Sequence, residues 1–229
     1  MGFDHLHVSS LPLIRLRLAQ LASHLVVALI ALVVIGGATR VMEAGLACPD
    51  WPLCYGVFLP GRQMNIQVFL EWFHRLDAFL VGIALLVQFV VALIFKSKLP
   101  QWLIWVYGAL LFLLVIQALL GALTVLQLLP SGIVMAHLAL ALTLVALMSW
   151  LSQRLLEIKK LPAPAWWRIM TFGSLTLVIG QSLLGARMAT TWASKTCLSQ
   201  GIGCQLLDSH RMFAMAVTLF ILIFVVTAI

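Results

Sequence analysis

The sequence predicts an all-α membrane protein, a polytopic helical bundle with six transmembrane helices. Of its 229 residues, 63% are hydrophobic and only 9% are charged, and the apolar residues occur in long runs. A soluble domain carries about 25% charged residues, whereas a spanning helix needs about 20 mainly apolar residues. Six runs meet or approach that length: residues 21–39, 70–95, 102–126, 133–151, 169–186 and 212–229.

The basic residues predict the orientation of these spans. With the N-terminus inside, the outer loops proper hold only Arg62 and Lys195, and the other basic residues between spans are inside or at helix ends. The positive-inside rule therefore favours a cytoplasmic N-terminus with the cysteine-containing loops outside. The net charge of +7 is spread along the chain, which argues against a nucleic-acid patch. The N-terminal segment carries Asp4 and only two arginines, so we expect no transit peptide. The first run is long enough to remain as a span, so we expect no signal peptide either.

A motif recurs at the ends of alternate spans. IGGATR, QALLGALTV and QSLLGAR close the first, third and fifth runs, and His74, His137 and His210 open the runs that follow. This predicts a helical hairpin repeated three times, although small residues also simply allow close helix packing. An arginine, a cysteine pair and a His-Arg dipeptide recur over a longer interval. We therefore expect a four-helix half at residues 1–160 and a partial second half at 161–229, with a complete six-helix protein as the alternative.

The three histidines are candidate metal ligands. Ionisable groups inside a membrane are costly and indicate function, and the hairpin pattern predicts His74, His137 and His210 in one layer. Imidazoles from facing helices can ligate a haem iron axially. A lone membrane histidine such as His24 is better explained by a helix–helix hydrogen bond. Zinc or copper is the alternative, with Glu71 as a ligand, but the cysteines lie in separate loops, so the pattern favours haem.

Four arginines at helix ends are candidates for binding haem propionates. Arginine pairs with carboxylates through a bidentate fork, and two of the four directly follow a candidate histidine ligand. Ordinary snorkelling to the membrane interface is the alternative explanation. The four residues are Arg40, Arg75, Arg187 and Arg211.

Glu71 distinguishes the first half from the second. It precedes His74 by three residues and so shares its helix face, whereas Leu207 occupies the matching position before His210. A buried carboxyl group on the ligand face can act in proton transfer. This asymmetry predicts a reactive first half and an electron-carrying second half. Pairing of Glu71 with Arg75 at the membrane edge is the alternative.

Several motifs closely resemble the heme A synthase family. They are GGATR, GLACPDWPLC, EWFHRLDAF and LTVLQLLPSGIVMAHLALA in the first half, with a looser match through GQSLLGAR and DSHR in the second. The resemblance extends from about residue 21 to the end. It implies an oxidoreductase of a family whose members have eight helices in two halves. These enzymes convert the C8 methyl of heme O to a formyl group, giving the heme A of terminal oxidases.

The resemblance also implies roles for individual residues. His74 and His137 would hold the substrate heme O, Glu71 would be catalytic, and His210 would be one iron ligand of a heme b cofactor. The family's fourth histidine ligand, on an eighth helix, has no counterpart here. The implied location is a bacterial plasma membrane, with heme O synthase, terminal oxidase assembly and lipid as partners; a homo-oligomer is left open. Methyl oxidation requires the redox reactivity of iron, which side chains lack.

Two other classes of protein remain as alternatives at this stage. A b-type cytochrome subunit that passes electrons without modifying haem would explain the histidines, but not Glu71 or the cysteine loops. A transporter or an assembly scaffold would use the histidines without iron. The haem content of the purified protein distinguishes the three classes.

The cysteine pairs Cys48/Cys54 and Cys197/Cys204 allow a metal clip, a redox pair, a disulfide or no role. A zinc clip would need further ligands nearby. Placement outside favours disulfides, because that compartment is usually oxidising, and cysteine pairs of the resembling family can form them. The loop closed by Cys48 and Cys54 would then be a lid above His74, stiffened by its prolines. Whether the pair also exchanges electrons stays open.

Overall fold

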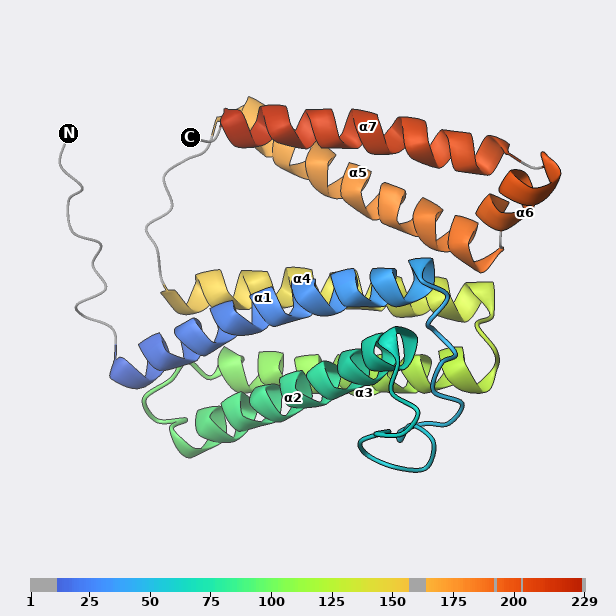
Figure 1. Ribbon diagram of the computed structural model, residues 1–229. Coiled ribbons are helices and arrows are strands. Elements are labelled where there is room, and N and C mark those ends of the chain that lie inside the picture. Colours follow the sequence, from blue (N-terminus) through green and yellow to red (C-terminus); the bar gives the residue numbers. More distant parts are fainter. Residues whose placement is uncertain (1–11, 157–163, 192, 203, 228–229) are drawn as a thin grey trace. The chain divides into compact units, whose positions relative to one another are not determined.

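The computed structural model describes residues 12–156, 164–191, 193–202 and 204–227. These residues form helices and loops without a named strand, as Figure 1 shows. Six of the helices are long and apolar enough to cross a membrane, and α6 is the exception. The prediction of a polytopic, all-α membrane protein is confirmed. The helices are α1 (Leu13–Val41), α2 (Ile66–Ile94), α3 (Trp102–Leu126), α4 (Ser131–Leu156), α5 (Ala165–Thr190), α6 (Ala193–Gln200) and α7 (Gln205–Val226).

The helices belong to two compact units. The first unit contains α1, α2, α3 and the part of α4 from Leu140 onward, and the second contains residues 129–139 with α5, α6 and α7. His137 therefore belongs to the second unit, although it lies on α4. The predicted boundary after residue 160 falls outside the described residues, so the division into halves at 1–160 and 161–229 stays a prediction.

Five of the six spanning helices begin earlier than their apolar runs, and the difference is largest for α1 and α7. Helix α1 starts at Leu13 rather than residue 21, and α7 starts at Gln205 rather than residue 212. Polar side chains can occupy the extra turns because the helical backbone satisfies its own hydrogen bonds and long side chains find partners nearby. Arg15 is an example: its side chain is buried, and Nη2 donates to the Arg154 carbonyl at the end of α4 (3.0 Å).

The core of the first unit combines large apolar side chains with small residues on α1. Ala19 and Ala22 are fully buried beside leucines from α1, α2, α3 and α4. Lipid is as apolar as leucine, so close van der Waals packing and interhelical hydrogen bonds hold such helices together. One of these bonds joins the hydroxyl oxygens of Ser23 and Ser152, which are 2.8 Å apart.

In the second unit, α5 and α7 lie side by side and α6 lies in the connection between them (Figure 1). The Trp167 ring of α5 contacts the Phe224 ring of α7, with centroids 5.0 Å apart. At the other end of α5, the hydroxyl of Thr190 donates to the hydroxyl of Ser131 at the start of α4 (2.9 Å). Helix α6 was not predicted, because its eight residues lack a long apolar run.

A buried polar pair links α2 to α3. The Tyr107 hydroxyl donates to Oε1 of Gln88 (2.7 Å), and both side chains are fully buried. We expect Tyr107→Phe to lower the free energy of unfolding by about 0.6–1.7 kcal/mol, the range measured for interhelical hydrogen bonds in membranes. Denaturant-induced unfolding in detergent micelles measures this change.

Two further variants serve as controls for this prediction. Tyr55→Phe alters the other tyrosine, which is exposed, and should leave stability unchanged. The double variant Gln88→Leu/Tyr107→Phe should recover much of the loss, because replacing both partners with apolar groups removes the unpaired polar atom. Equal stabilities of the wild type and Tyr107→Phe would contradict the proposed contribution of this bond.

Candidate functional site

Helix α2 carries three of the predicted site residues near its start. Asn65 caps the helix by accepting hydrogen bonds from the amides of Gln67 and Val68 (both 3.0 Å), which satisfies two amides that lack helical partners. Glu71, His74 and Arg75 follow within about two and a half turns. Spacings of three and four residues place them on neighbouring parts of one helix face.

Glu71 connects α2 to the loop that precedes it. Its side chain is only 5% exposed. Oε2 accepts a hydrogen bond from the Cys48 amide (2.8 Å), and Oε1 accepts one from Arg75 (2.5 Å). A buried carboxylate is stable only when it is paired and hydrogen-bonded. These donors meet that requirement, so Glu71 has a definite structural role whatever its chemistry.

Arg75 points its guanidinium group at the same loop. Besides Glu71, it donates to the carbonyl oxygens of Asp50 (2.6 Å), Leu53 and Cys48 (3.4 Å). The five N–H groups of arginine suit it to bind several carbonyls at once. Arg75 was predicted as a propionate ligand, but the structure uses its side chain to hold the loop and to pair with Glu71. The pairing of Glu71 with Arg75, which the sequence offered as the alternative role of Glu71, is therefore an observed contact.

Both cysteine pairs form disulfide bonds, as predicted. Cys48 and Cys54 are joined and buried, and they pack with Val68 of α2. Residues 49–53 form the covalently closed part of the loop. On the far side of Cys54, the Trp72 indole donates to the Phe58 carbonyl (2.7 Å). The second disulfide joins Cys197 of α6 to Cys204 at the start of α7.

Asp50 organises the turn within the first disulfide loop. Its two carboxylate oxygens accept hydrogen bonds from the amides of Tyr55 and Gly56 (both 2.7 Å). Its slight burial opposes ionisation, but these two bonds and the charge of Arg75 outweigh that effect. They hold the pKa of Asp50 below its usual value of 3.8. Tyr55 and Gly56 both have positive φ, 57° and 73°, so the carboxylate stabilises a turn that an L-residue rarely adopts.

His74 packs against the motif that ends α1. A methyl group added to Gly36 would lie 3.2 Å from Cε1 of the His74 ring, whereas nothing lies within 4 Å of such a group at Gly37. The imidazole therefore sits directly on the backbone of α1. This contact explains why a small residue of the first motif recurs in step with the histidine on the next span.

The same arrangement occurs in the second unit. A methyl group at Gly185 of α5 would lie 2.9 Å from Cε1 of His210 on α7. In addition, Nε2 of Gln181 lies 3.0 Å from Nδ1 of His210 and donates to the His210 carbonyl oxygen (2.9 Å). The ring of His210 is therefore fixed by a close backbone and by an amide side chain.

The three histidines occupy comparable depths on their helices. His74, His137 and His210 lie eight, six and five residues after the first residue of α2, α4 and α7, which corresponds to about one and a half to two turns. His74 belongs to the first unit and the other two to the second. Their predicted arrangement in one layer stays a prediction.

The donor set fits haem better than a bare metal ion. Among the residues that the structure describes, no group of three or more His, Cys, Asp or Glu side chains is placed to hold an ion. The four cysteines are consumed in disulfides, which removes the thiolates that zinc sites favour. A haem needs only axial imidazoles from apolar surroundings, and the histidines lie on apolar spans.

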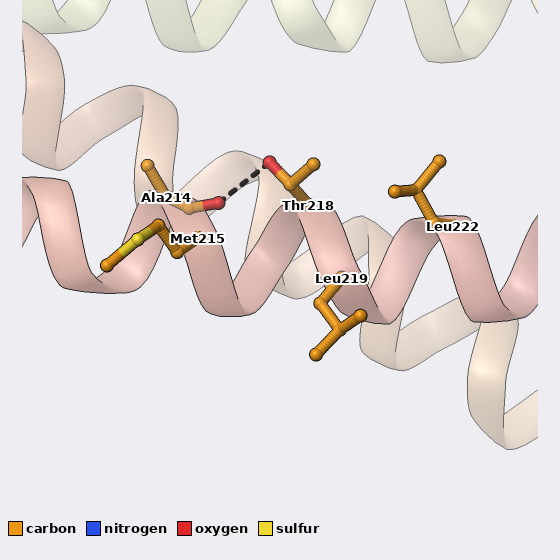
Figure 2. A pocket seen from close by; sticks show the side chains of 5 residues that line it. All are labelled: Ala214, Met215, Thr218, Leu219 and Leu222. Atoms are coloured by element: carbon orange, nitrogen blue, oxygen red, sulfur yellow. Dashed lines mark hydrogen bonds between the residues drawn. The ribbon is translucent and has the colours of Figure 1, made fainter.

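An open apolar pocket lies on α7 and begins one helical turn after His210. It is lined by Ala214, Met215, Thr218, Leu219 and Leu222, as Figure 2 shows. The Thr218 hydroxyl donates to the Ala214 carbonyl (2.8 Å), which satisfies its proton. Ala214 follows His210 by one helical turn and so shares its face. This surface has no group for acid–base chemistry.

The other predicted arginines lie at helix ends. Arg40 is in the last turn of α1 and Arg187 in the last turn of α5, whereas Arg211 directly follows His210 on α7. Arg187 and Arg211 are exposed and Arg40 is half-buried. Their role toward propionates stays a prediction.

Sequence reasoning did not assign roles to Gln181, Trp72 or Asp50. Gln181 had a recognisable signal, because the spacing Gln-x-x-x-Gly occurs at Gln181–Gly185 and again at Gln117–Gly121. The contacts of Trp72 and Asp50 with the loop backbone have no such signal in the sequence.

The chain matches a known protein family over most of its length. Residues 19–229 match the family model described as cytochrome oxidase assembly protein, COX15-CtaA. The chain belongs to the COX15-CtaA family. This match covers both units and includes every candidate site residue discussed above.

Curated relatives in the COX15-CtaA family carry the name heme A synthase. The chain is 29% identical over 213 residues to the heme A synthase of Rhodopseudomonas palustris strain HaA2, covering 76% of this chain and 57% of the relative. It is 28% identical to that of Shewanella oneidensis, covering 72% and 54%. It is 30% identical to that of Caulobacter sp. strain K31, covering 69% and 56%. The chain thus spans about half the length of these relatives.

We expect Asp50→Asn to loosen the disulfide loop at neutral pH. The amides of Tyr55 and Gly56 should exchange with solvent roughly 3- to 10-fold faster, because an exposed charged hydrogen bond contributes about 0.5–1.5 kcal/mol. Hydrogen exchange measured by mass spectrometry on the intact protein tests this.

The pH dependence gives the control for this prediction. A carboxylate whose pKa is lowered by folding stabilises the fold above its ordinary pKa, and the contribution disappears as the pH falls through the lowered value. The difference between wild type and Asp50→Asn should therefore be constant from neutral pH down to about 5 and vanish in stronger acid. A difference that grows as the pH falls would contradict this assignment.

Gly185→Ala should destabilise the second unit relative to Gly180→Ala. Alanine is favoured over glycine within a helix by about 0.5–1 kcal/mol. This gain is expected at Gly180, where nothing lies within 4 Å of the added methyl, but at Gly185 the methyl meets the His210 ring. Overpacking costs about 1–3 kcal/mol, so the two variants should differ by that amount in unfolding free energy. Equal stabilities would contradict the close packing of this ring.

Proposed function

We propose that this chain performs the heme A synthase reaction, oxidising the C8 methyl group of heme O to a formyl group. Membership of the COX15-CtaA family and the names of its relatives support this proposal. The observation that carries it is the arrangement on α2, where buried Glu71 and His74 share a face beside a disulfide-closed loop. An electron-carrying cytochrome would need the histidines but not this carboxylate.

We propose His74 and His137 as the residues that hold the substrate heme O, and His210 as a ligand of a heme b cofactor. The close contacts of Gly36 and Gly185 with the rings of His74 and His210 support this, because a histidine that would bind iron needs a fixed ring orientation. When bound, haem supplies the redox reactivity that no side chain of the chain possesses.

Glu71 is the proposed acid–base residue of the reaction. Its carboxyl group is buried, and the Cys48 amide and Arg75 fix both of its oxygens. Fixed donors orient a carboxyl group without solvent, and a positioned carboxyl group exchanges a proton with a reacting group efficiently. With 5% of its surface exposed, Glu71 itself is shielded from bulk water. Leu207 replaces this carboxylate in the second unit, in agreement with an electron-carrying role there.

The remaining arginines are the proposed partners of haem propionates. Arg40 and Arg187 lie in the last turns of α1 and α5, the spans that precede His74 and His210 along the chain, and Arg211 directly follows His210. Arginine binds carboxylates through paired hydrogen bonds. Arg75 already binds the loop and Glu71, so any contact with a propionate would be additional to those bonds.

The proposed location is a bacterial plasma membrane, with the N-terminus in the cytoplasm and both disulfide loops outside. The distribution of basic residues supports this orientation, and disulfides persist in an oxidising compartment. Because the hydrophobic substrate and product must be transferred, we propose heme O synthase and the terminal oxidase assembly machinery as partners.

We expect His74→Ala and His137→Ala to abolish heme A formation by the full chain and to remove bound heme O. Glu71→Gln should lower turnover by about 10²–10⁴-fold, the contribution typical of acid–base catalysis, while reducing haem retention much less. Pigment extraction followed by chromatography measures heme O, heme A and heme b in the purified protein.

His24→Ala is the matched control, because His24 is an exposed histidine on α1 with no proposed haem contact. It should retain full activity. Parallel losses of turnover and haem retention in Glu71→Gln would show that Glu71 acts only as a support for the loop. Heme b as the sole pigment, with no conversion of added heme O, would favour an electron-carrying cytochrome instead.

A further inference from the structure

The side chain of Gln181 makes two contacts with a single residue on the neighbouring helix. Its Nε2 atom lies 2.9 Å from the carbonyl oxygen of His210 and 3.0 Å from Nδ1 of the same residue. Gln181 precedes Gly185 by one turn, and Gly185 contacts the same ring. Helix α5 therefore presents an amide and a bare backbone to one imidazole.

These contacts determine where the ring proton lies. A carbonyl oxygen only accepts hydrogen bonds, so the atom of the Gln181 amide facing it must be the NH₂ group. That group has two protons and no acceptor capacity, and it donates one proton to the carbonyl and the other to Nδ1. Nδ1 of His210 is therefore an acceptor, and a neutral ring carries its proton on Nε2.

Iron ligation through Nε2 requires the other tautomer. The proton on Nε2 must leave, and the ring stays neutral when a proton occupies Nδ1 instead. An Nδ1–H group in an apolar helix pair then needs an acceptor. Within the described part of the chain, Oε1 of Gln181 is buried and has no hydrogen-bond partner. Rotation of the amide about its terminal bond presents this oxygen to Nδ1 and gives up the hydrogen bond to the His210 carbonyl. The side chain must also shift so that the two oxygens separate, and the carbonyl keeps its helical hydrogen bond one turn further along α7.

We propose that Gln181 is a positioning residue for His210, donating to Nδ1 in the haem-free ring and accepting from Nδ1–H when Nε2 binds haem iron. No net proton is gained or lost by the ring, because the proton on Nε2 is replaced by one on Nδ1. This inference rests on the proposed role of His210 as a haem ligand.

Helix α1 has no amide side chain at the position that corresponds to Gln181 on α5. Leu32 occupies the corresponding position, four residues before Gly36, so the Gly36 face of α1 has no amide at that point. Gln117 occupies the corresponding position four residues before Gly121, on the span that precedes His137. The spacing alone therefore does not separate the proposed cofactor ligand from the proposed substrate ligands, and the inference rests on the contacts of Gln181 with His210.

The first test uses the haem-free full chain with ¹⁵N-labelled histidine. The ¹⁵N chemical shifts of His210, assigned by their loss in His210→Ala, should show the Nε2–H tautomer in the wild type. In Gln181→Leu the Nδ1 shift should move toward that of an imidazole nitrogen without a hydrogen bond, because Nδ1 loses its donor. Gln205→Leu, which removes an exposed amide from the start of α7, should leave this shift unchanged.

The second test adds heme b to the same proteins. Gln181→Leu should bind it about 10- to 100-fold more weakly, the loss typical when the hydrogen-bond partner of a ligating histidine is removed. Gln181→Glu supplies a stronger acceptor for Nδ1–H, so it should retain heme b and lower its midpoint potential. This second variant keeps the test decisive if Gln181→Leu does not fold.

The outcomes separate this inference from the proposed function. If His210→Ala binds heme b as tightly as the wild type, the ligand assignment fails, and the inference fails with it. If His210 is required but Gln181→Leu and Gln181→Glu both match the wild type in affinity and potential, only the role of Gln181 is overturned. An Nδ1–H tautomer in the haem-free wild type would also overturn it.

Discussion

The ion pair between Glu71 and Arg75 is the contact on which the placement of the first disulfide loop against α2 depends. Each charge would be costly in a buried position unless its remaining hydrogen-bonding groups also found partners. The disulfide loop supplies them: the Cys48 amide binds Glu71, and three loop carbonyls accept from Arg75. The loop and the first turns of α2 are therefore mutually dependent. His74 lies between these two residues in the sequence, so their contacts with the loop also hold the turn of α2 that carries it.

The disulfide and the ion pair have complementary effects on the loop. The disulfide closes a ring of seven residues from Cys48 to Cys54, which restricts the unfolded loop. It does not specify where the closed loop lies. The polar contacts of Glu71, Arg75 and Trp72 attach it to α2, and Asp50 fixes its internal turn. The loop is thus a structural part of the candidate site.

In both units a histidine ring packs between two helices in the same way, but the groups around the ring differ. In each, a histidine on one span packs against a glycine on the preceding span, because only a residue without a side chain allows that approach. Around His74 the neighbouring functional group is a carboxylate on its own helix. Around His210 it is an amide on the partner helix. A common scaffold therefore supports two different chemical environments.

The sequence by itself determined the approximate spans, the candidate histidines and the family. These depend on the length of apolar runs and on short motifs, which are local properties of the chain. It also identified Glu71 as the feature that makes the halves unlike. The helix ends of α1 and α7 could not be predicted from hydropathy, because polar residues continue a helix once their side chains find partners, as Arg15 does at the Arg154 carbonyl.

Only the tertiary structure decided how the polar side chains are used. Arg75 could have faced a propionate or the loop, and its sequence position is the same in both cases. The choice depends on the carbonyl groups that the folded loop brings within reach. Gln181 likewise gains its role only when α5 and α7 pack against each other. Hydrogen bonds between residues distant in sequence require a particular packing of helices, and no local pattern encodes that packing.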